Sequence, residues 1–352
     1  MRTSPNSVAS FASAAIPGLK TPSSLEMRMR IFKELRTSAR GGNLSGSLLP
    51  AMGAGARRVT LVQNPSAGAG AVAQRQLLKA LEEAGHEVRP VEPDKGLGKN
   101  LSQRADVVIA AGGDGTVLGV ARRLVHTKVP LVILPLGTAN NLARSVGMPN
   151  DLEVLLELLD EPRERPLDIG VATGSWGERY FCESAGVGWF SEALQVEVTE
   201  DDKEPERAVA VLREALMAYT PKRWTVTIDG EDASGEYLSI DVMNAKYFGP
   251  NLKLGKRAEP FDGVLDVVML KAQDAKRMIA YLAALENTPD SPAPPFETRK
   301  AKHVHIVLEE RRLRIDDAVR PKPGALRSHF ADLRLLAGAV RLWLPPQQRE
   351  TR

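Results

Sequence analysis

The feature that most constrains the fold of this chain is a glycine-rich turn between an apolar run and a helix. The run over residues 106–111 leads directly into Gly112, Gly113, Asp114, Gly115 and Thr116. Such an unbroken apolar run is typical of a strand buried on both faces, as in a parallel sheet. Three glycines around one carboxylate let backbone N–H groups approach an anion at a helix N-terminus, although a steric βα turn also uses glycine. The turn predicts a phosphate site at the carboxyl edge of a parallel sheet.

The same order of strand, polar turn and helix recurs twice in the first half of the chain. Residues 59–63 read as a strand, 64–70 as a turn of small and polar residues, and 71–84 as a helix that ends at Gly85. Residues 129–134 form another apolar run, followed by a turn over residues 135–144. The alternation predicts an α/β domain over residues 57–164, built on a doubly wound parallel sheet. No G-x-x-x-x-G-K-[ST] motif is present, so a P-loop is excluded.

After residue 164 the pattern changes to short strands. A helix over residues 152–159 and a linker over residues 162–166 precede it. Strands are predicted at residues 167–172, 179–183, 224–229, 237–243, 264–270, 304–309, 313–316, 333–336 and 340–344, with helices at 206–219 and 275–285. Residues 165–347 are therefore expected to form a second, β-rich domain.

Charge and composition exclude several classes of protein. The chain has 352 residues and a net charge of +3, yet residues 1–58 hold nine basic and two acidic residues, leaving 38 basic against 42 acidic. The fold itself is mildly acidic, which argues against nucleic-acid binding. The only cysteine, Cys182, rules out an intrachain disulfide, and no apolar run approaches the ~20 residues that cross a bilayer.

Residues 1–56 are rich in Ser, Gly, Ala and Arg, and are expected to form a disordered basic extension. A targeting arm and a basic membrane-surface segment are the functional alternatives. A dispensable tail, or a true start at Met52, is the interpretation we favour.

Taken in order, the motifs resemble those of the diacylglycerol kinase catalytic-domain superfamily, which includes bacterial lipid kinases and sphingosine kinases. They are NPSAGAG at residues 64–70, GGDGT at 112–116 and PLGTANNLARSVG at 135–147. The resemblance continues through DIG at 168–170, AGVG at 185–188, NAKYFG at 244–249 and DGVLD at 262–266, and covers about residues 57–345.

The resemblance implies a fold and two cofactors. The first domain would be like those of 6-phosphofructokinase and NAD kinases, the second would be a β-sandwich, and ATP would bind between them. Residues implied at the ATP site are Asn64, Pro65, Ser66, Gly68, Gly112, Gly113, Asp114, Gly115, Thr116, Thr138 and Asn140. Asp114 would lie beside the phosphates and Mg²⁺, as a catalytic residue. Asp262, with carbonyls of Glu259 and Val264, matches a structural Mg²⁺ site, and a simple hairpin turn at residues 262–263 is an equal alternative.

The chain also departs from the family pattern. Gly119 replaces an acid common in relatives, and the segment Cys182, Glu183 and Ser184 differs from theirs. Most consequentially, Ala318 stands where the family reads the Glu of Asp-Gly-Glu, the candidate general base. Asp317 is the expected replacement, and Glu183 is the alternative.

The expected function is therefore an ATP- and Mg²⁺-dependent lipid kinase that acts on a diacylglycerol-like or sphingoid lipid. It would be cytoplasmic and peripheral at the membrane, and a homodimer is compatible with the sequence. The alternatives are a catalytically weak nucleotide- or lipid-binding protein and an NAD kinase. His303 and His305 are expected to be ordinary strand residues rather than metal ligands. The pairs Arg311–Arg312 and Lys300–Lys302 are expected on a solvated face, or facing anionic lipid.

Overall fold

The computed structural model describes residues 56–63, 70–93, 101–194, 205–288, 291–293, 295–309, 311–322, 324–325 and 327–345. The predicted extension over residues 1–56 lies outside these ranges except for Ala56. Of the predicted turn over residues 64–70, residues 64–69 lie outside these ranges as well, and Gly70 is the first residue of a helix. Residues 50–352 form one unit, to which all the described residues belong.

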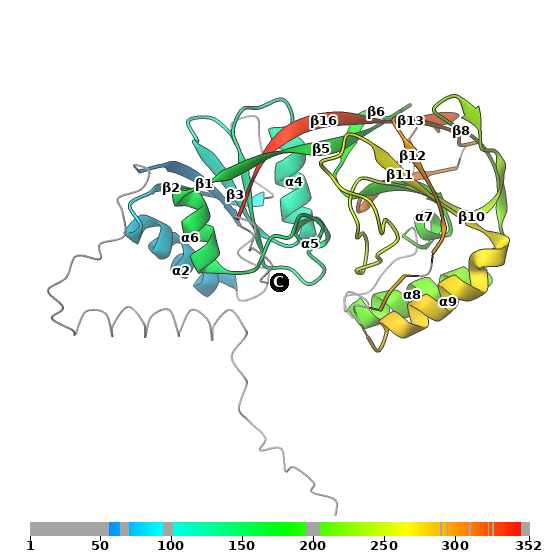
Figure 1. The fold of residues 1–352 in the computed structure, drawn as a ribbon, viewed down its shortest axis with the longest axis horizontal. Helices are drawn as coiled ribbons and strands as arrows, with labels where there is room; N and C mark the ends of the chain where they lie inside the picture. Colours follow the sequence, from blue (N-terminus) through cyan, green and yellow to red (C-terminus); the bar gives the residue numbers. More distant parts are fainter. Residues whose placement is uncertain are drawn as a thin grey trace, which may run out of the picture. The chain divides into compact units, whose positions relative to one another are not determined.

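The first lobe is a parallel sheet flanked by helices, as predicted. Its strands are β1 (Arg58–Gln63), β2 (Glu87–Val91), β3 (Val107–Gly112) and β4 (Leu131–Pro135), in the order β2-β1-β3-β4. β3 and β4 are buried along their whole length, as their apolar runs require. The helices of this lobe are α2 (Gly70–Glu83), α4 (Asp114–Leu124), α5 (Asn141–Val146) and α6 (Leu152–Asp160), shown around the sheet in Figure 1.

One long strand, β16 (Phe330–Leu344), joins this sheet to the rest of the fold. It pairs in parallel with β4 through Leu342 and Leu131, and antiparallel with β5 (Arg163–Gly174). The expected linker over residues 162–166 is therefore wrong, because all but its first residue belong to β5. Pro166 is tolerated there because β6 (Gly177–Phe181) pairs with β5 only from Gly170 onward, which leaves one side of Pro166 free of a strand partner.

The two strands predicted at residues 333–336 and 340–344 are one strand with an irregularity. The register of β16 against β5 shifts between Leu336 and Val340. Gly338 adopts a positive φ of 59° in this bulge and donates its N–H to Asp168 Oδ1 at 2.7 Å. Glycine occurs here because the bulge requires a positive φ. The same glycine interrupts the alternating strand pattern, which is why the sequence predicts two strands instead of one.

The second lobe is a β-sandwich. One sheet continues from β16 through β13 (His303–Val307) and β8 (Lys222–Ile228). The other sheet contains β7 (Ser184–Gly188), β10 (Gly235–Met243), β11 (Leu265–Lys271), β12 (Glu297–Ala301), β14 (Leu313–Ile315) and β15 (Ala318–Arg320), and β9 (Glu231–Asp232) pairs with β8. A buried apolar cluster that includes Trp224, Phe181 and Ile240 fills the space between the sheets.

Three helices form a further layer on the second sheet. They are α7 (Trp189–Ala193), α8 (Pro205–Ala218) and α9 (Ala275–Leu285), and Figure 1 shows α8 and α9 lying together below β10. A separate apolar cluster, which includes Trp189, Leu212 and Leu282, packs between them and the sheet. Among the described residues, no helix has both the length and the apolar character that crossing a bilayer requires.

Candidate active site

Two glycine-bearing turns meet at the carboxyl edge of the first sheet. β3 ends at Gly112, and α4 begins at Asp114, so Gly113 is the N-cap of the helix. A Cβ atom on Gly137, in the turn after β4, would lie 2.3 Å from the Cα of Gly113. Glycine is needed at this contact because any side chain would push the turns apart. The two turns therefore form one continuous backbone surface at the start of α4.

Asp114 is held by the turn that follows β4. Its Oδ1 accepts the Asn141 backbone N–H at 2.6 Å. Burial raises the pKa of the Asp114 carboxyl, and backbone N–H groups, that of Asn141 foremost, oppose the shift. The Asn141 side chain in turn donates to the Gly249 carbonyl at 2.9 Å and to Glu183 Oε2 at 3.4 Å, both in the second lobe. Asn141 thus connects Asp114 to the opposite wall of the site.

The other residues predicted at the nucleotide site differ in exposure and in their contacts. Thr138 is exposed in the turn after β4. Asn140 has a left-handed backbone with φ of 50°, and its side chain closes the turn by bonding the Gly137 N–H at 3.0 Å and the Gly137 carbonyl at 2.7 Å. Thr116 is buried in the first turn of α4. Asn64, Pro65, Ser66 and Gly68 lie outside the described residues.

Asp316 is the structural centre of the second wall. Its Oδ2 accepts the Cys182 N–H at 2.9 Å, and its Oδ1 accepts the N–H groups of Glu183 at 2.9 Å and Ser184 at 3.0 Å. Arg122 of α4 donates to Asp316 Oδ2 at 2.7 Å, so the bond crosses from the first lobe to the second. The buried carboxylate fixes the turn between β6 and β7 and, with it, the position of Glu183.

A second buried arginine supports the same turn. Arg314 has no exposed side chain and donates to Asp241 at 2.8 Å and to Ser184 Oγ at 3.0 Å. Its guanidinium also lies over the rings of Phe248 and Phe190, with 4.5 and 5.0 Å to their centroids. Hydrogen bonds and ring contacts offset the cost of burying this charge.

Glu183 points toward the site without a full set of partners. It is 4% exposed, and its Oε1 has no hydrogen-bond partner among the described residues. Burial is the main cause that raises the pKa of the Glu183 carboxyl well above its ordinary value; the carboxylates of Asp114 and Asp316 add to this, and Arg314 opposes it. A buried acceptor that faces a cavity is placed to meet a ligand hydroxyl.

Asp317, the predicted base, lies in a different environment. Its side chain is 60% exposed and pairs with Arg122 at 3.2 Å. Ala318, where the family carries its Glu, faces a separate small cavity that also contains Arg122 and Arg320. The two neighbouring residues therefore face different cavities, as alternation along a chain entering β15 requires.

The carboxylates and an apolar surface enclose one cavity of about 250 Å³. Asp114 and Glu183 in this lining are both bonded to Asn141, and most of the apolar side chains come from α7 and α8. Its lining includes Asp114, Asn141, Glu183, Asp316 and Asp317, together with Leu118, Phe190, Ala193, Leu194, Val211 and Leu212. An arrangement of this kind accommodates an alcohol whose hydroxyl reaches carboxylates and whose remainder is hydrocarbon.

Comparison with known proteins agrees with this arrangement. The diacylglycerol kinase catalytic domain matches residues 58–172, and the YegS C-terminal NAD kinase beta sandwich-like domain matches residues 193–321. The chain is 31% identical over 257 residues to a protein of Pseudomonas aeruginosa (strain UCBPP-PA14) named "Probable lipid kinase YegS-like", covering 68% of this chain and 80% of that one. This chain belongs to the diacylglycerol kinase catalytic-domain family. A Pseudomonas fluorescens relative of the same name is 31% identical over 246 residues, covering 66% of this chain and 80% of the relative.

Solved structures show the same fold. A diacylglycerol kinase from Bacillus anthracis str. Sterne superposes with a TM-score of 0.61 at 21% identity, covering 82% of this chain and 98% of that one. The predicted α/β lobe and β-sandwich lobe are therefore confirmed.

The described residues fit the phosphates of a nucleotide in one respect. A Cβ atom added at Gly115, in the first turn of α4, would meet nothing within 4 Å, so the N-terminal end of this helix faces open space. Helix N-termini of this kind bind phosphate oxygens. Among the residues that the structure describes, no group of three or more His, Cys, Asp or Glu side chains is arranged to hold a metal by itself. Mg²⁺ commonly binds through substrate phosphates and one or two carboxylates, a role for which Asp114 is suited.

Asp262 lies in a turn where its own carboxylate and the Glu259 carbonyl already have partners. Its Oδ1 accepts the Val264 N–H at 3.2 Å and its Oδ2 accepts Lys300 Nζ at 2.9 Å. The Glu259 carbonyl accepts the Phe261 N–H at 2.7 Å. Lys300 therefore supplies positive charge to the carboxylate to which the resemblance assigns Mg²⁺. The arrangement does not favour a metal ion at this turn, and Asp262 as a ligand stays a prediction.

The remaining candidates of the sequence lie away from the cavity. His303 and His305 each contact Asp332 Oδ1 at 2.9 Å on the outer side of β13. Lys300 is turned toward Asp262 and Asp266 rather than outward.

The sequence did not single out Arg122, Asn141 or Arg314, which hold the site together. Asn141 lies within a quoted motif, and its position after the left-handed Asn140 was the available signal. Arg122 lies two turns into α4. No local sequence signal indicates its role, because its partner Asp316 is 194 residues away in the chain.

Proposed function

We propose that this protein is an ATP- and Mg²⁺-dependent lipid kinase, which transfers the γ-phosphoryl group of ATP to a hydroxyl of a diacylglycerol-like or sphingoid lipid. The observation that carries the proposal is a cavity of about 250 Å³ whose lining combines four carboxylates with apolar side chains of α7 and α8. Family membership supports phosphoryl transfer, and the apolar lining supports a lipid acceptor rather than a nucleotide acceptor.

The reaction joins the acceptor oxygen to the γ-phosphorus of ATP and breaks the bond to the bridging oxygen, so that ADP leaves. The acceptor proton must move to a base, and Glu183 is the group we assign, since its Oε1 has no other partner among the described residues. Asn141 orients Glu183 through its amide at 3.4 Å, while its backbone N–H holds Asp114. Positioning of this kind accounts for most of the catalysis of phosphoryl transfer.

Nucleotide and metal are assigned to the first lobe. The open N-terminal end of α4 at Gly115 would receive phosphate oxygens, and Asp114 would hold Mg²⁺ beside them. The metal, when bound, neutralises the charge that develops on the transferred group. We place the enzyme in the cytoplasm, acting at the membrane surface where its substrate resides.

The first experiment follows label from the γ-phosphate of ATP into lipid. Purified protein with Mg²⁺ is given mixed micelles of diacylglycerol, sphingosine, ceramide and undecaprenol in parallel. We expect one class to be labelled, and Asp114→Asn to abolish the label. Asp232→Asn is the matched control, because Asp232 is an exposed residue of β9, outside the cavity.

One alternative has an observation behind it. Ala318 lacks the carboxylate that the family pattern places there, which favours a protein that binds nucleotide and lipid with little turnover. ATP binding that Asp114→Asn weakens, without label in any lipid, would support this alternative against the kinase.

A further inference from the structure

A second and larger cavity lies in the β-sandwich lobe, apart from the carboxylates. It has a volume of about 520 Å³ and lies between α7, β8 and the loop that joins β15 to β16. We call it the basic pocket; it is lined by Gly188, Glu192, Trp224, Arg311, Arg312, Pro321, Lys322, Gly324, Ala325 and Arg327. It shares no lining residue with the 250 Å³ cavity.

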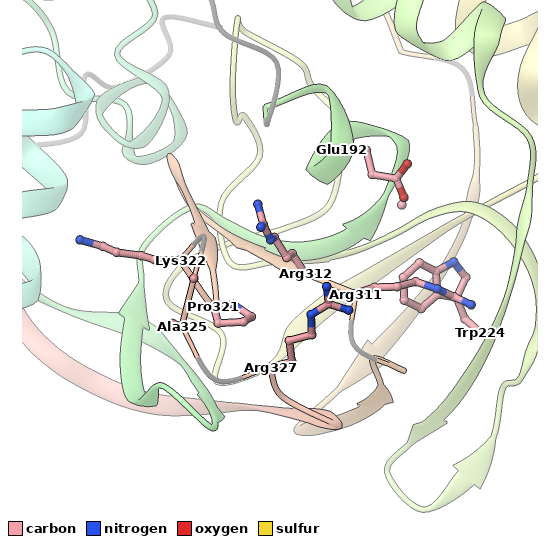
Figure 2. Close-up of a pocket in the computed structure, with 10 residues that line it drawn as sticks. Glu192, Trp224, Arg311, Arg312, Pro321, Lys322, Ala325 and Arg327 are labelled. Atoms are coloured by element: carbon pink, nitrogen blue, oxygen red, sulfur yellow. The ribbon is translucent and has the colours of Figure 1, made fainter.

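Arginine side chains dominate this pocket. Figure 2 shows Arg312 and Arg327 between Lys322 and Trp224 in this view, with Arg311 lying across Trp224 and Lys322 directed away from the arginines. The Arg311 guanidinium lies 4.4 Å from the centroid of the Trp224 ring, which holds it in place. Each guanidinium carries five N–H donors, so one that bonds within the protein still has donors for a ligand.

Negative charge in the lining does not cancel these cations. Glu192 is the only acidic residue among the described lining residues, and it is ion-paired with Lys222. Arg311 pairs with Glu309 at 2.8 Å, outside the lining. Counted by residue type, the described lining holds four basic side chains against one acidic side chain, and this excess of positive charge attracts an anion.

The guanidinium groups of the lining favour a phosphate group as the anion. Two guanidinium forks suit the several oxygens of a phosphate better than a single carboxylate. Trp224, which is 2% exposed, forms part of the wall and supplies the ring over which Arg311 lies.

We propose that the basic pocket binds a phosphate group, carried either by an anionic lipid head group or by a soluble phosphate ester. Its volume accommodates the phosphate together with the group that bears it. Residues that line the basic pocket are close in sequence to residues that line the carboxylate cavity. Arg312 immediately precedes β14, which leads to Asp316, and the Ser191 hydroxyl of α7 donates to the Arg312 carbonyl at 3.2 Å. Phe190 and Ala193 of the same helix line the other cavity.

Two binding measurements at low ionic strength test the proposal. Calorimetric titration with inorganic phosphate and with glycerol 3-phosphate measures binding of soluble esters. Co-sedimentation with phosphatidylcholine vesicles, with and without phosphatidylglycerol, measures binding of a lipid head group. The test variant is Arg312→Gln/Arg327→Gln, and the control is Arg257→Gln/Arg334→Gln, which removes two charges from exposed positions outside the pocket.

We expect the test variant to weaken binding of at least one probe by about tenfold or more, and the control to stay within about twofold of the wild type. Binding in the soluble arm alone identifies a soluble ester, and binding in the vesicle arm alone identifies a head group; both support the site. Equal affinities of test and control variants in both arms, or no binding by the wild type in either, overturn it.

Arg327→Gln alone is the second variant, because this exposed loop residue can be changed with little effect on folding. It should weaken binding in the same arm as the double variant. Neither arm uses ATP or measures phosphoryl transfer, so failure of the kinase assignment and failure of this site are separate results.

Discussion

At the scale of single residues, the proposed phosphoryl transfer depends on which carboxylate accepts the proton of the acceptor hydroxyl. Asp317 is 60% exposed, and its carboxylate is already paired with Arg122 at 3.2 Å. Glu183 is buried, faces the cavity and has a raised pKa. A carboxylate whose pKa is raised is a stronger base in proton transfer.

The first prediction follows from this difference. Glu183→Gln should lower kcat by ~10²–10⁴-fold, because the amide keeps the shape of the side chain but cannot accept the proton. Asp317→Asn should lower it by less than ~10-fold. Steady-state lipid phosphorylation measures both variants. If Asp317→Asn proves the more damaging of the two, the base is Asp317 and not Glu183.

The second prediction concerns pH. Burial, and then the carboxylates of Asp114 and Asp316, raise the pKa of Glu183, so the carboxyl is protonated and inactive as a base at low pH. kcat/KM should therefore rise with pH through a value well above the ~4.3 of a free Glu side chain. Glu183→Gln should remove this rise from its residual activity. A profile that is unchanged in the variant assigns the titration to another group.

The same shift has a consequence for stability. The native state binds more protons than the unfolded state between the unfolded and the raised native pKa of Glu183, so stability should fall as pH rises through that window. Glu183→Gln, which resembles the protonated form, should lose less stability across it in urea unfolding.

At the scale of elements, the turn between β6 and β7 depends on Asp316. Its carboxylate accepts three backbone N–H groups and Arg122, and its own φ of 49° lies in the left-handed region that Asn also tolerates. Asp316→Asn should therefore keep the backbone conformation but remove the negative charge that pairs with Arg122. We expect it to lower the unfolding free energy by roughly 3–5 kcal/mol, as when one partner of a buried ion pair is removed. Asp317→Asn is the matched control and should stay within about 0.5 kcal/mol. Equal urea midpoints for the two variants would count against this role.

A further prediction at this scale concerns metal removal at β11 and β12. Lys300 Nζ contacts Asp262 at 2.9 Å and Asp266 at 2.8 Å, and Asp266 has only 2% of its side chain exposed. If Lys300 supplies the positive charge at this turn, a chelator should not change the melting temperature. Lys300→Met should lower the unfolding free energy by about 1–2 kcal/mol, less than a fully buried pair because the lysine is 45% exposed. A melting temperature that falls with chelator in the wild type would instead support Mg²⁺ at Asp262.

The elements that the sequence predicts well are those whose cause is local. The buried runs of β3 and β4 and the glycine turn at residues 112–116 need only neighbouring residues to be recognised. Short elements such as α7 and β15 were missed, because three to five residues carry too little periodicity and form by packing on distant strands. The site shows the same division. Asp114 was found from its turn, whereas the bonds of Asp316 to Cys182 and Arg122 join residues 134 and 194 positions apart.

At the scale of the whole described unit, β16 makes the two lobes depend on each other. The buried cluster around β1, β3 and β4 includes Val340, Leu342, Trp343 and Leu344 from this last strand, as well as Leu167 and Ile169 from β5. The same strand pairs with β13 in the sandwich. The first lobe cannot complete its apolar core without β16, a strand that also belongs to the second lobe. We therefore expect the two lobes to unfold together.

Leu342→Ala tests this dependence. Leu342 is fully buried and pairs with Leu131 of β4, so its truncation should cost roughly 2–5 kcal/mol. If unfolding is shared, native-state hydrogen exchange should accelerate by a similar factor in β3 of the first lobe and in β10 of the second, although only β3 belongs to the same apolar cluster. Met217→Ala, at a side chain 63% exposed on α8, should change neither rate. Acceleration confined to β3 would mean that the first lobe opens alone, and that β16 joins the sheets without coupling their stability.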